Sequence, residues 1–206
     1  IVMTHGDDRG IIVPPRIASL QIVVIPIVFK ENRDEVLSKA REIVKKFRAK
    51  NYGIEADERD GYTPGWKFNE WELKGIPLRI EIGPRDVEAE QIVLVRRDTN
   101  EKTIVKNKDA EKKVAETLND IQENLLKKAR EFLNKSIVEA SDLGEFTKAI
   151  TDKKIAKALF CGESGCEDVI KEKTEGATCR CIPFEQKPAN GNCVQCNSPA
   201  KFWALF

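Results

Sequence analysis

The sequence has little of several things that would assign a protein to a class at once. Of its 206 residues, one is histidine and one is methionine, and 35 Lys+Arg against 34 Asp+Glu leave a formal net charge of +1. The longest apolar run, around residues 21–29, is far shorter than the about 18 residues that a membrane-spanning helix requires. We therefore expect no membrane association, and any nucleic-acid-binding face must be a local patch rather than a global positive field.

The beginning of the chain carries no processing signal. Residues 1–3 lead directly into His5-Gly-Asp-Asp-Arg9, without a basic segment or a cleavage site. This favours a cytoplasmic protein. Because the first residue is not Met and the first few resemble the end of a buried strand, we also expect the chain to be the C-terminal piece of something longer.

Alternating strand and helix patterns predict an α/β fold for the first part of the chain. The β-branched run 21–29 is typical of a strand covered on both faces, and residues 33–50 carry apolar side chains at helical spacing before a short strand over 54–58. This strand–helix–strand order predicts parallel pairing with a right-handed crossover. A short helix follows, and then residues 78–83, 91–97 and 103–105 alternate as strands. We expect a mixed, mainly parallel sheet flanked by helices.

A long helix marks the boundary between two units. From 109 to about 135, apolar residues keep to one stripe that ends with Phe132 and Leu133. Beyond it the composition changes: a helix is expected over 142–150, a strand over 154–160 and another over 178–183, and all six cysteines fall between Cys161 and Cys196. This part reads as a second, smaller α+β domain.

Four of the cysteines form two closely spaced pairs, Cys161/Cys166 and Cys193/Cys196. Such pairs can place four thiolates around one tetrahedral ion, and zinc prefers sulfur ligands at about 2.3 Å. Since four protein ligands leave no position open for water, the spacing predicts a structural rather than a catalytic zinc site.

Two alternatives stay open for these cysteines. Disulfides are one, although a cytoplasmic location and the pair spacing argue against them. Redox chemistry at Cys193-Val-Gln-Cys196 is another, although such motifs usually open a helix, and Asn197-Ser-Pro199 does not continue one. Cys179 and Cys181, which flank Arg180, point to opposite faces of the expected strand and are interpreted as packing residues or free thiols.

The helix expected around residues 64–74 combines aromatic rings with charges of both signs. Single-stranded RNA is read by stacking of splayed bases and by hydrogen bonds to their edges, and a carboxylate can accept hydrogen bonds from guanine. Neighbouring strands and loops supply arginines and a lysine that could contact phosphates: Arg79, Arg85, Arg96, Arg97 and Lys102. The alternative is that the rings are core residues and the charges a solvated face.

Five ordered blocks of the sequence resemble one family. They are VMTHGDDRGIIVPPR (2–16), QIVVIP (21–26), TPGWKFNEWELKG (63–75), EIGPRD (81–86) and the late cysteine pairs. In this order they resemble the C-terminal part of archaeal or eukaryotic-type prolyl-tRNA synthetases, which are class II aminoacyl-tRNA synthetases. The resemblance covers essentially the whole chain.

The resemblance implies three parts: the end of the class II catalytic domain (1–18), an anticodon-binding domain (19–125) and a C-terminal zinc-binding domain (126–206). It implies activation of proline by ATP to prolyl adenylate and transfer of the prolyl group to tRNA(Pro), within a homodimer. The motifs that bind ATP, Mg²⁺ and proline lie upstream in such proteins, so this chain alone should have no catalytic residues.

The resemblance also assigns roles to individual residues. It implies Phe68 as a stacking surface, Glu72 as the carboxylate that reads guanine, and Arg79, Arg85 and Lys102 as base or phosphate contacts. It implies Cys161, Cys166, Cys193 and Cys196 as the zinc ligands. Phe68 and Glu72 lie four residues apart and therefore share one helical face, as a single base pocket requires.

Two other classes of function remain as alternatives. A non-catalytic adaptor could use the same fold to bind another RNA or a protein and keep a structural zinc site, although it would have no reason to retain the block from His5 to Arg16. A thiol redox protein would show reversible oxidation of Cys193 and Cys196 without metal.

Overall fold

A computed structural model describes residues 1–206, and the chain divides into two compact units, Ile1–Ala129 and Arg130–Phe206. We call them the first and the second unit. No helix in the chain combines the length and the apolarity that crossing a membrane needs.

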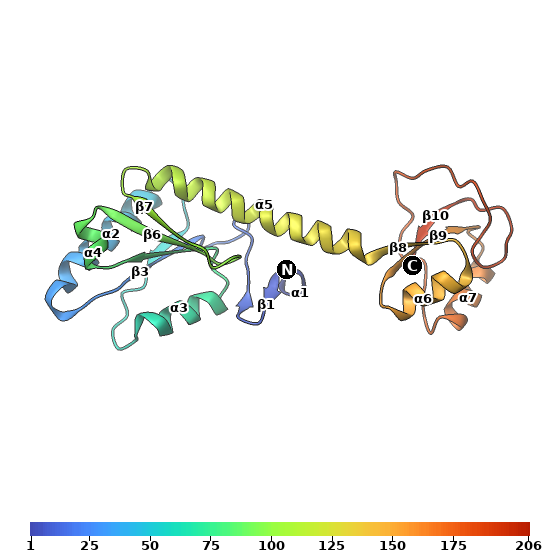
Figure 1. The fold of residues 1–206 in the computed structure, drawn as a ribbon, viewed down its shortest axis with the longest axis horizontal. Helices are drawn as coiled ribbons and strands as arrows, with labels where there is room; N and C mark the ends of the chain where they lie inside the picture. The colour runs from blue at the N-terminus through green and yellow to red at the C-terminus, as the bar shows by residue number, and fades with distance from the viewer. The chain divides into compact units, whose positions relative to one another are not determined.

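The first unit contains a five-stranded sheet in the order β4-β3-β5-β6-β7 (Figure 1). Its strands are β3 (Ile22–Pro26), β4 (Ile54–Ala56), β5 (Leu78–Ile82), β6 (Gln91–Arg96) and β7 (Lys102–Lys106). The β3 strand pairs in parallel with β4 and β5, whereas β5–β6 and β6–β7 are antiparallel. The predicted mixed α/β sheet is confirmed, but it is not mainly parallel, because the β6–β7 hairpin makes two of its four pairings antiparallel.

Helices lie on both faces of this sheet (Figure 1). The helical segments from Val2 to Ser136 are the short α1 (Val2–His5), the 3-10 turn η1 (Lys30–Asn32), α2 (Arg33–Arg48), α3 (Pro64–Leu73), α4 (Pro84–Glu88) and the long α5 (Ala110–Ser136). The α2 and α5 helices pack on one face, where Ile22 and Val24 of β3 belong to the main apolar core. The α3 helix packs on the other, where Val23 and Ile25 contact Trp71.

The alternation of β5 gives these two faces different chemistry. Leu78, Ile80 and Ile82 enter the main core, whereas Arg79 and Glu81 point to the α3 side. The register places Arg79 opposite Val95 of β6, which lies opposite Lys102 of β7. Buried charges therefore lie on the α3 side of the sheet.

The first residues of the chain are packed against α3. A two-stranded ribbon, β1 (Gly6–Asp7) and β2 (Gly10–Ile11), lies beside the end of this helix. Gly10 has φ +126°, and a side chain there would collide with the backbone of Leu73. This close approach holds the ribbon against the end of α3.

The second unit has a three-stranded sheet in the order β10-β9-β8. Its elements are β8 (Ile137–Ala140), α6 (Leu143–Thr151), β9 (Ile155–Phe160), α7 (Ser164–Lys173) and β10 (Phe202–Leu205). The predicted strand over 178–183 is wrong, because only Cys181 forms a bridge there, to Leu205. Pro183, which has no N–H, cannot extend the pairing.

The burial of the apolar stripe changes along the long helix α5. Val114, Leu118, Ile121 and Leu125 are buried, but Phe132 and Leu133 are exposed. The predicted stripe is therefore a core contact only in its first part.

Candidate nucleic-acid interface and metal centre

The α3 helix has clear local start and stop signals. The Thr63 hydroxyl caps its first turn by accepting a hydrogen bond from the Trp66 N–H at 3.3 Å, and Pro64 occupies the first helical position. Gly75, with φ +75°, ends the helix. Local signals in the sequence therefore determine where α3 begins and ends.

A buried carboxylate anchors α3 to the end of β4. Asp57 accepts hydrogen bonds from Trp71 Nε1 at 2.8 Å and from Arg59 Nε and Nη2 at 2.9 and 2.7 Å. Lys67 Nζ donates to the Asp57 carbonyl oxygen at 2.9 Å. Burial alone would raise the pKa of Asp57, but the hydrogen bonds from Arg59 and Trp71 outweigh it, so the pKa lies well below the usual range. Lys67 and Trp71 are therefore structural residues.

An open hollow lies along the exposed side of α3. It has a volume of about 650 Å³ and is lined by Arg9, Gly65, Phe68, Asn69, Glu72, Leu73 and Arg79. Three of the predicted RNA-binding residues thus meet at one place. The predicted sharing of a helical face by Phe68 and Glu72 is what brings them together.

Ion pairs and a ring contact organise the polar groups of this hollow. The Arg79 guanidinium lies 4.3 Å from the Phe68 ring centroid and donates to Glu72 Oε1 at 2.9 Å and, through Nε, to Glu81 Oε1 at 3.0 Å. Lys102 Nζ donates to Glu81 Oε2 at 2.9 Å and lies 5.9 Å from the Phe68 centroid. Lys102 therefore belongs to the same group of side chains, through Glu81.

The two oxygens of Glu72 are in different situations. Oε1 accepts from Arg79, whereas Oε2 lies 3.9 Å from Arg9 Nη1, beyond hydrogen-bond distance. The side chain is mostly buried but lines the hollow. It can accept hydrogen bonds from a ligand that enters beside the Phe68 ring.

Arg85 does not line the hollow. It lies on α4, just after the carboxyl end of β5, and is exposed. Its position suits a contact with a phosphate more than with a base in the hollow.

Arg96 and Arg97 serve the fold instead. Arg96 pairs with the buried Asp98 at 2.8 Å. Arg97, which is buried, donates to both oxygens of Asp7 at 2.8 and 2.7 Å and to the Glu72 carbonyl oxygen at 2.9 Å. Internal partners thus engage Nε and Nη2 of Arg96 and all three side-chain nitrogens of Arg97, so the structure gives both residues a role in the fold.

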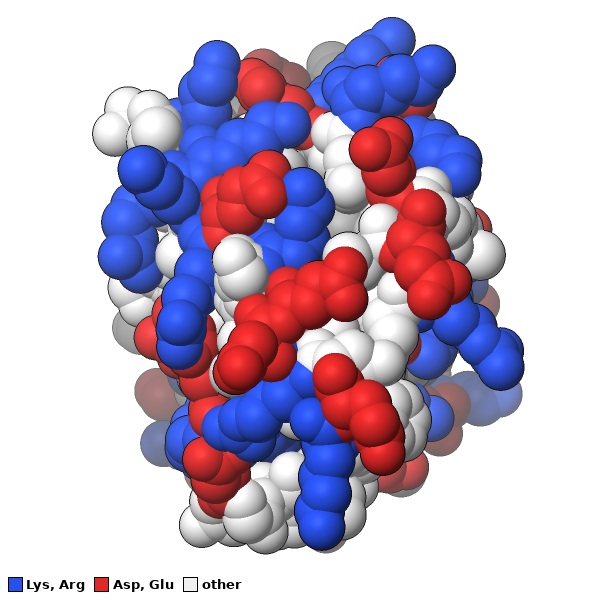
Figure 2. Space-filling view, turned by 90° about the vertical axis from the view of Figure 1, so that its left-hand side faces the viewer, with Lys and Arg blue, Asp and Glu red and all other residues white.

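Charges of both signs are interspersed on the end of the first unit where α2 and α4 lie (Figure 2). Exposed pairs such as Arg41 with Glu58 and Arg33 with Asp60 neutralise much of this surface. Charges of opposite sign thus offset one another on this face, and it presents no uniform positive field.

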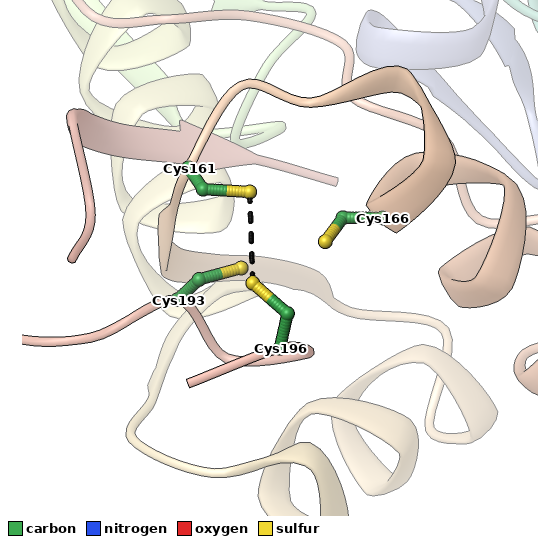
Figure 3. A group of neighbouring side chains, drawn as sticks. All are labelled: Cys161, Cys166, Cys193 and Cys196. Atoms are coloured by element: carbon green, nitrogen blue, oxygen red, sulfur yellow. Dashed lines mark hydrogen bonds between the residues drawn. The ribbon is translucent and has the colours of Figure 1, made fainter. Parts of the chain in front are cut away.

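Two loops of the second unit bring four sulfurs together. Cys161 follows β9 directly, Gly162 turns the chain with φ +81°, and Cys166 lies in the first turn of α7. Cys193 and Cys196 belong to a tight turn in which the Asn197 N–H donates to the Cys193 carbonyl oxygen at 3.0 Å. The four side chains point toward one centre (Figure 3).

The spacing of the sulfurs fits one metal ion. All four Sγ atoms lie within 4.8 Å of one another, and Cys161 and Cys196 Sγ are 3.8 Å apart. Four sulfurs at about 2.3 Å from one tetrahedral ion are separated by about 3.8 Å. The predicted cluster of Cys161, Cys166, Cys193 and Cys196 is therefore able to hold a metal.

The environments of the thiols differ. Burial raises the pKa of Cys161 and of Cys166, whereas hydrogen bonds from Ser198 lower the pKa of Cys196 to about 6. Four thiolates this close repel one another, and a bound dication would remove that repulsion. Cys179 and Cys181 lie outside the cluster.

Comparison with known families and proteins matches the regions that contain the hollow and the cysteine cluster. A model described as "Anticodon binding domain" matches residues 21–117, and one described as "Prolyl-tRNA synthetase, C-terminal" matches residues 143–206. The chain is 48% identical over 202 residues to a proline--tRNA ligase from Ruminiclostridium cellulolyticum, covering 98% of this chain and 41% of that protein. It is 43% identical over 227 residues to the bifunctional glutamate/proline--tRNA ligase of Mus musculus, covering 100% of this chain and 15% of that protein.

The chain belongs to the prolyl-tRNA synthetase family. It spans about two fifths of the length of the proline--tRNA ligases that it matches. Within the family's anticodon-binding domain lie all five residues that the resemblance assigned to RNA, and within the C-terminal domain lie the four clustered cysteines.

Two residues at the candidate interface were not predicted from the sequence. Glu81 is buried and holds both Arg79 and Lys102, and Arg9 reaches the hollow from outside the matched domain. The strict alternation of residues 78–82 carried a signal for Glu81, since it places this residue on the same face as Arg79. No local signal pointed to Arg9.

Proposed function

We propose that this chain is the portion of a prolyl-tRNA synthetase that binds tRNA(Pro), recognises its anticodon and holds a structural zinc ion. The parent enzyme would attach proline to tRNA(Pro) through ATP-dependent formation of prolyl adenylate. One observation carries the proposal: Phe68, Glu72 and Arg79 line one hollow within the matched anticodon-binding domain.

The hollow suits a guanine of the anticodon. Phe68 offers a ring face for stacking, and Glu72 offers acceptor oxygens for the N–H groups of the guanine edge. Arg79 and Arg9 bring guanidinium donors to the hollow, and Glu81 holds Arg79 and Lys102 in place. Arg85 lies outside the hollow and would contact the phosphate backbone.

The cysteine cluster would hold zinc through Cys161, Cys166, Cys193 and Cys196. An all-sulfur set of four matches the ligands of structural zinc sites and leaves no position for a reacting water. The ion would thus contribute to folding and take no part in aminoacylation.

The remaining partners belong to the parent enzyme. Proline, ATP and Mg²⁺ would bind outside this chain, which holds no catalytic residues of its own. We also propose that the enzyme acts in the cytoplasm as a homodimer.

The test is binding of the whole chain to tRNA(Pro) and to the same tRNA with both anticodon guanines changed, at one fixed salt concentration. We expect tighter binding of the unchanged tRNA. Glu72→Ala should remove most of this discrimination, worth about 1–3 kcal/mol, while Glu88→Ala, a change at an exposed glutamate of α4, should leave it intact.

Glu72→Gln separates two roles of the carboxylate, because it keeps an oxygen for Arg79 but replaces the other acceptor with a donor. Loss of discrimination in this variant supports direct reading of guanine. Equal binding of both tRNAs by the unmodified chain would overturn the proposed function.

A further inference from the structure

Two exposed aromatic rings stack on each other at the start of α3. The centroids of Tyr62 and Trp66 are 4.0 Å apart with an interplanar angle of 22°. The two residues are 47% and 43% exposed. Large rings in this position leave apolar surface in water, which costs free energy unless a ligand covers it.

Core packing does not account for this pair. Trp71, the other tryptophan of α3, is buried in the cluster with Val23 and Ile25 and donates from its indole to Asp57. Trp66 belongs to no such cluster. The helix therefore directs one tryptophan into the fold and keeps the other at the surface.

The stack is held in place by its neighbours. The Arg59 guanidinium lies 5.2 Å from the Tyr62 centroid and 5.3 Å from the Trp66 centroid. Arg59 is itself fixed by bidentate bonds to the buried Asp57 and by an ion pair with Glu70. Because the rings are already ordered, a ligand that stacks on them loses little entropy in the protein.

The stack is continuous with the hollow. Gly65 and Asn69, which lie next to Trp66 on α3, both line it. Glu72 lies six positions after Trp66, which corresponds to about 9 Å along a helix and about 120° around it. Asn69 lies midway between them and lines the hollow, so a nucleotide on the rings would occupy the face of α3 that adjoins the one where Glu72 reads a base.

We propose that Tyr62 and Trp66 form a second stacking platform, which receives one unpaired nucleotide of the tRNA(Pro) anticodon loop beside the guanines read at Phe68 and Glu72. This inference rests on the proposed function. Since Asp57 and Glu70 compensate the charge of Arg59, the platform offers ring faces and no net positive charge. It recognises a base by stacking, independently of the identity of that base.

The test measures binding of the whole chain to tRNA(Pro) and to the tRNA with both guanines changed, across a range of salt concentrations. Trp66→Ala should weaken binding of both tRNAs about tenfold, leaving their ratio unchanged, and Trp66→Phe should restore most of the loss. The slope of log affinity against log salt should not change, because no phosphate contact is removed. Phe184→Ala, a change at a fully exposed ring of the second unit, is the matched control and should have no effect.

A double-mutant cycle then identifies the nucleotide. Each nucleotide that flanks the two guanines is replaced in turn by an abasic one, and binding is measured with the unmodified chain and with Trp66→Ala. For one position the two losses should fail to add, because both changes remove the same contact.

The outcomes distinguish the platform from the function on which it rests. If the unmodified chain discriminates between the tRNAs but Trp66→Ala binds both as tightly as the unmodified chain, the platform is overturned and the anticodon proposal stands. A changed salt slope, or additive losses at every abasic position, also overturns the platform. If the unmodified chain does not discriminate, the anticodon proposal itself has failed.

Discussion

The two units are stabilised by different means. The core of the first unit is a continuous apolar layer between the sheet and the helices α2 and α5, rich in Ile, Leu and Val. The core of the second unit consists largely of alanines and two cysteines around Phe146, Phe160 and Phe206. Residues 174–201 of the second unit contain no helix or strand. The first unit can fold by burial of apolar surface. The second buries less of it and needs a further source of folding free energy.

The largest expected effect follows from this difference. Removal of the proposed zinc ion with a chelator should unfold the second unit and leave the first folded, because a structural zinc site supplies folding free energy that a small core lacks. Hydrogen exchange resolved along the chain would measure both units together.

Substitutions sharpen the same prediction. Cys193→Ser should reproduce the effect of the chelator, since it removes a buried ligand, while Cys181→Ser, at an exposed cysteine outside the cluster, should not. Continued protection of β9 amides without metal would contradict the proposed role of the ion.

The first unit should be most sensitive at its buried charge. Asp57→Asn leaves Lys67 and Arg59 without their carboxylate, and breaking a buried ion pair in this way should cost about 3 kcal/mol of unfolding free energy in the first unit. Hydrogen exchange of the β3 amides, measured at increasing denaturant concentration, gives this free energy. Asp60→Asn, which removes an exposed ion pair with Arg33, is the control and should change the unfolding free energy little. A similar loss of unfolding free energy in both variants would contradict the larger contribution expected from the buried pair.

The sequence was sufficient for much of the fold because its signals were local. Alternation predicted β5, helical spacing predicted α2 and α5, and the pair spacing predicted the cysteine cluster. The strands β8 and β10 were missed. The β8 strand follows α5 without a turn residue at Ser136–Ile137, and β10 is defined by its pairing with β9, which is distant in sequence.

At the candidate site, the sequence predicted the functional side chains but not the residues with which the neighbouring charged side chains pair. Phe68, Glu72 and Arg79 were named, yet the roles of Arg97 and Lys67 as internal donors depend on where Asp7 and Asp57 lie in three dimensions. A charged residue on a helix or strand has the same local pattern whether it faces water or a buried carboxylate. Only the packing of α3 on the sheet distinguishes the two cases.

Acid should weaken the first unit through the contact that holds the β1–β2 ribbon. The hydrogen bonds from Arg97 lower the pKa of Asp7 from its ordinary value of 3.8 to about 2. A carboxyl whose pKa is lower in the folded state stabilises the fold above its unfolded pKa, and this contribution is lost as the pH falls through the folded value. We therefore expect the contribution of Asp7 to disappear between about pH 4 and pH 2.

Hydrogen exchange of the ribbon and α3 amides, measured over this pH range in the unmodified chain and in Asp7→Asn, isolates that contribution. The variant should be less protected at neutral pH and should lose less protection on acidification. Because Asp7 is partly exposed, solvent screens the pair, and the effect should be smaller than that of Asp57→Asn. Parallel curves for the two proteins would contradict the assignment.

The smallest effect should come from a surface ion pair of the second unit. Lys157 Nζ lies 2.7 Å from Glu139 Oε1 on the neighbouring strand, but the Glu139 side chain is largely exposed. Glu139→Ala should therefore cost less than about 1 kcal/mol of unfolding free energy in the metal-loaded chain, and high salt should reduce even that. If Glu139→Ala instead lowered the unfolding free energy as much as expected for Asp57→Asn, this cross-strand ion pair would be a main source of stability in the second unit, which would contradict the role given to the cysteine cluster.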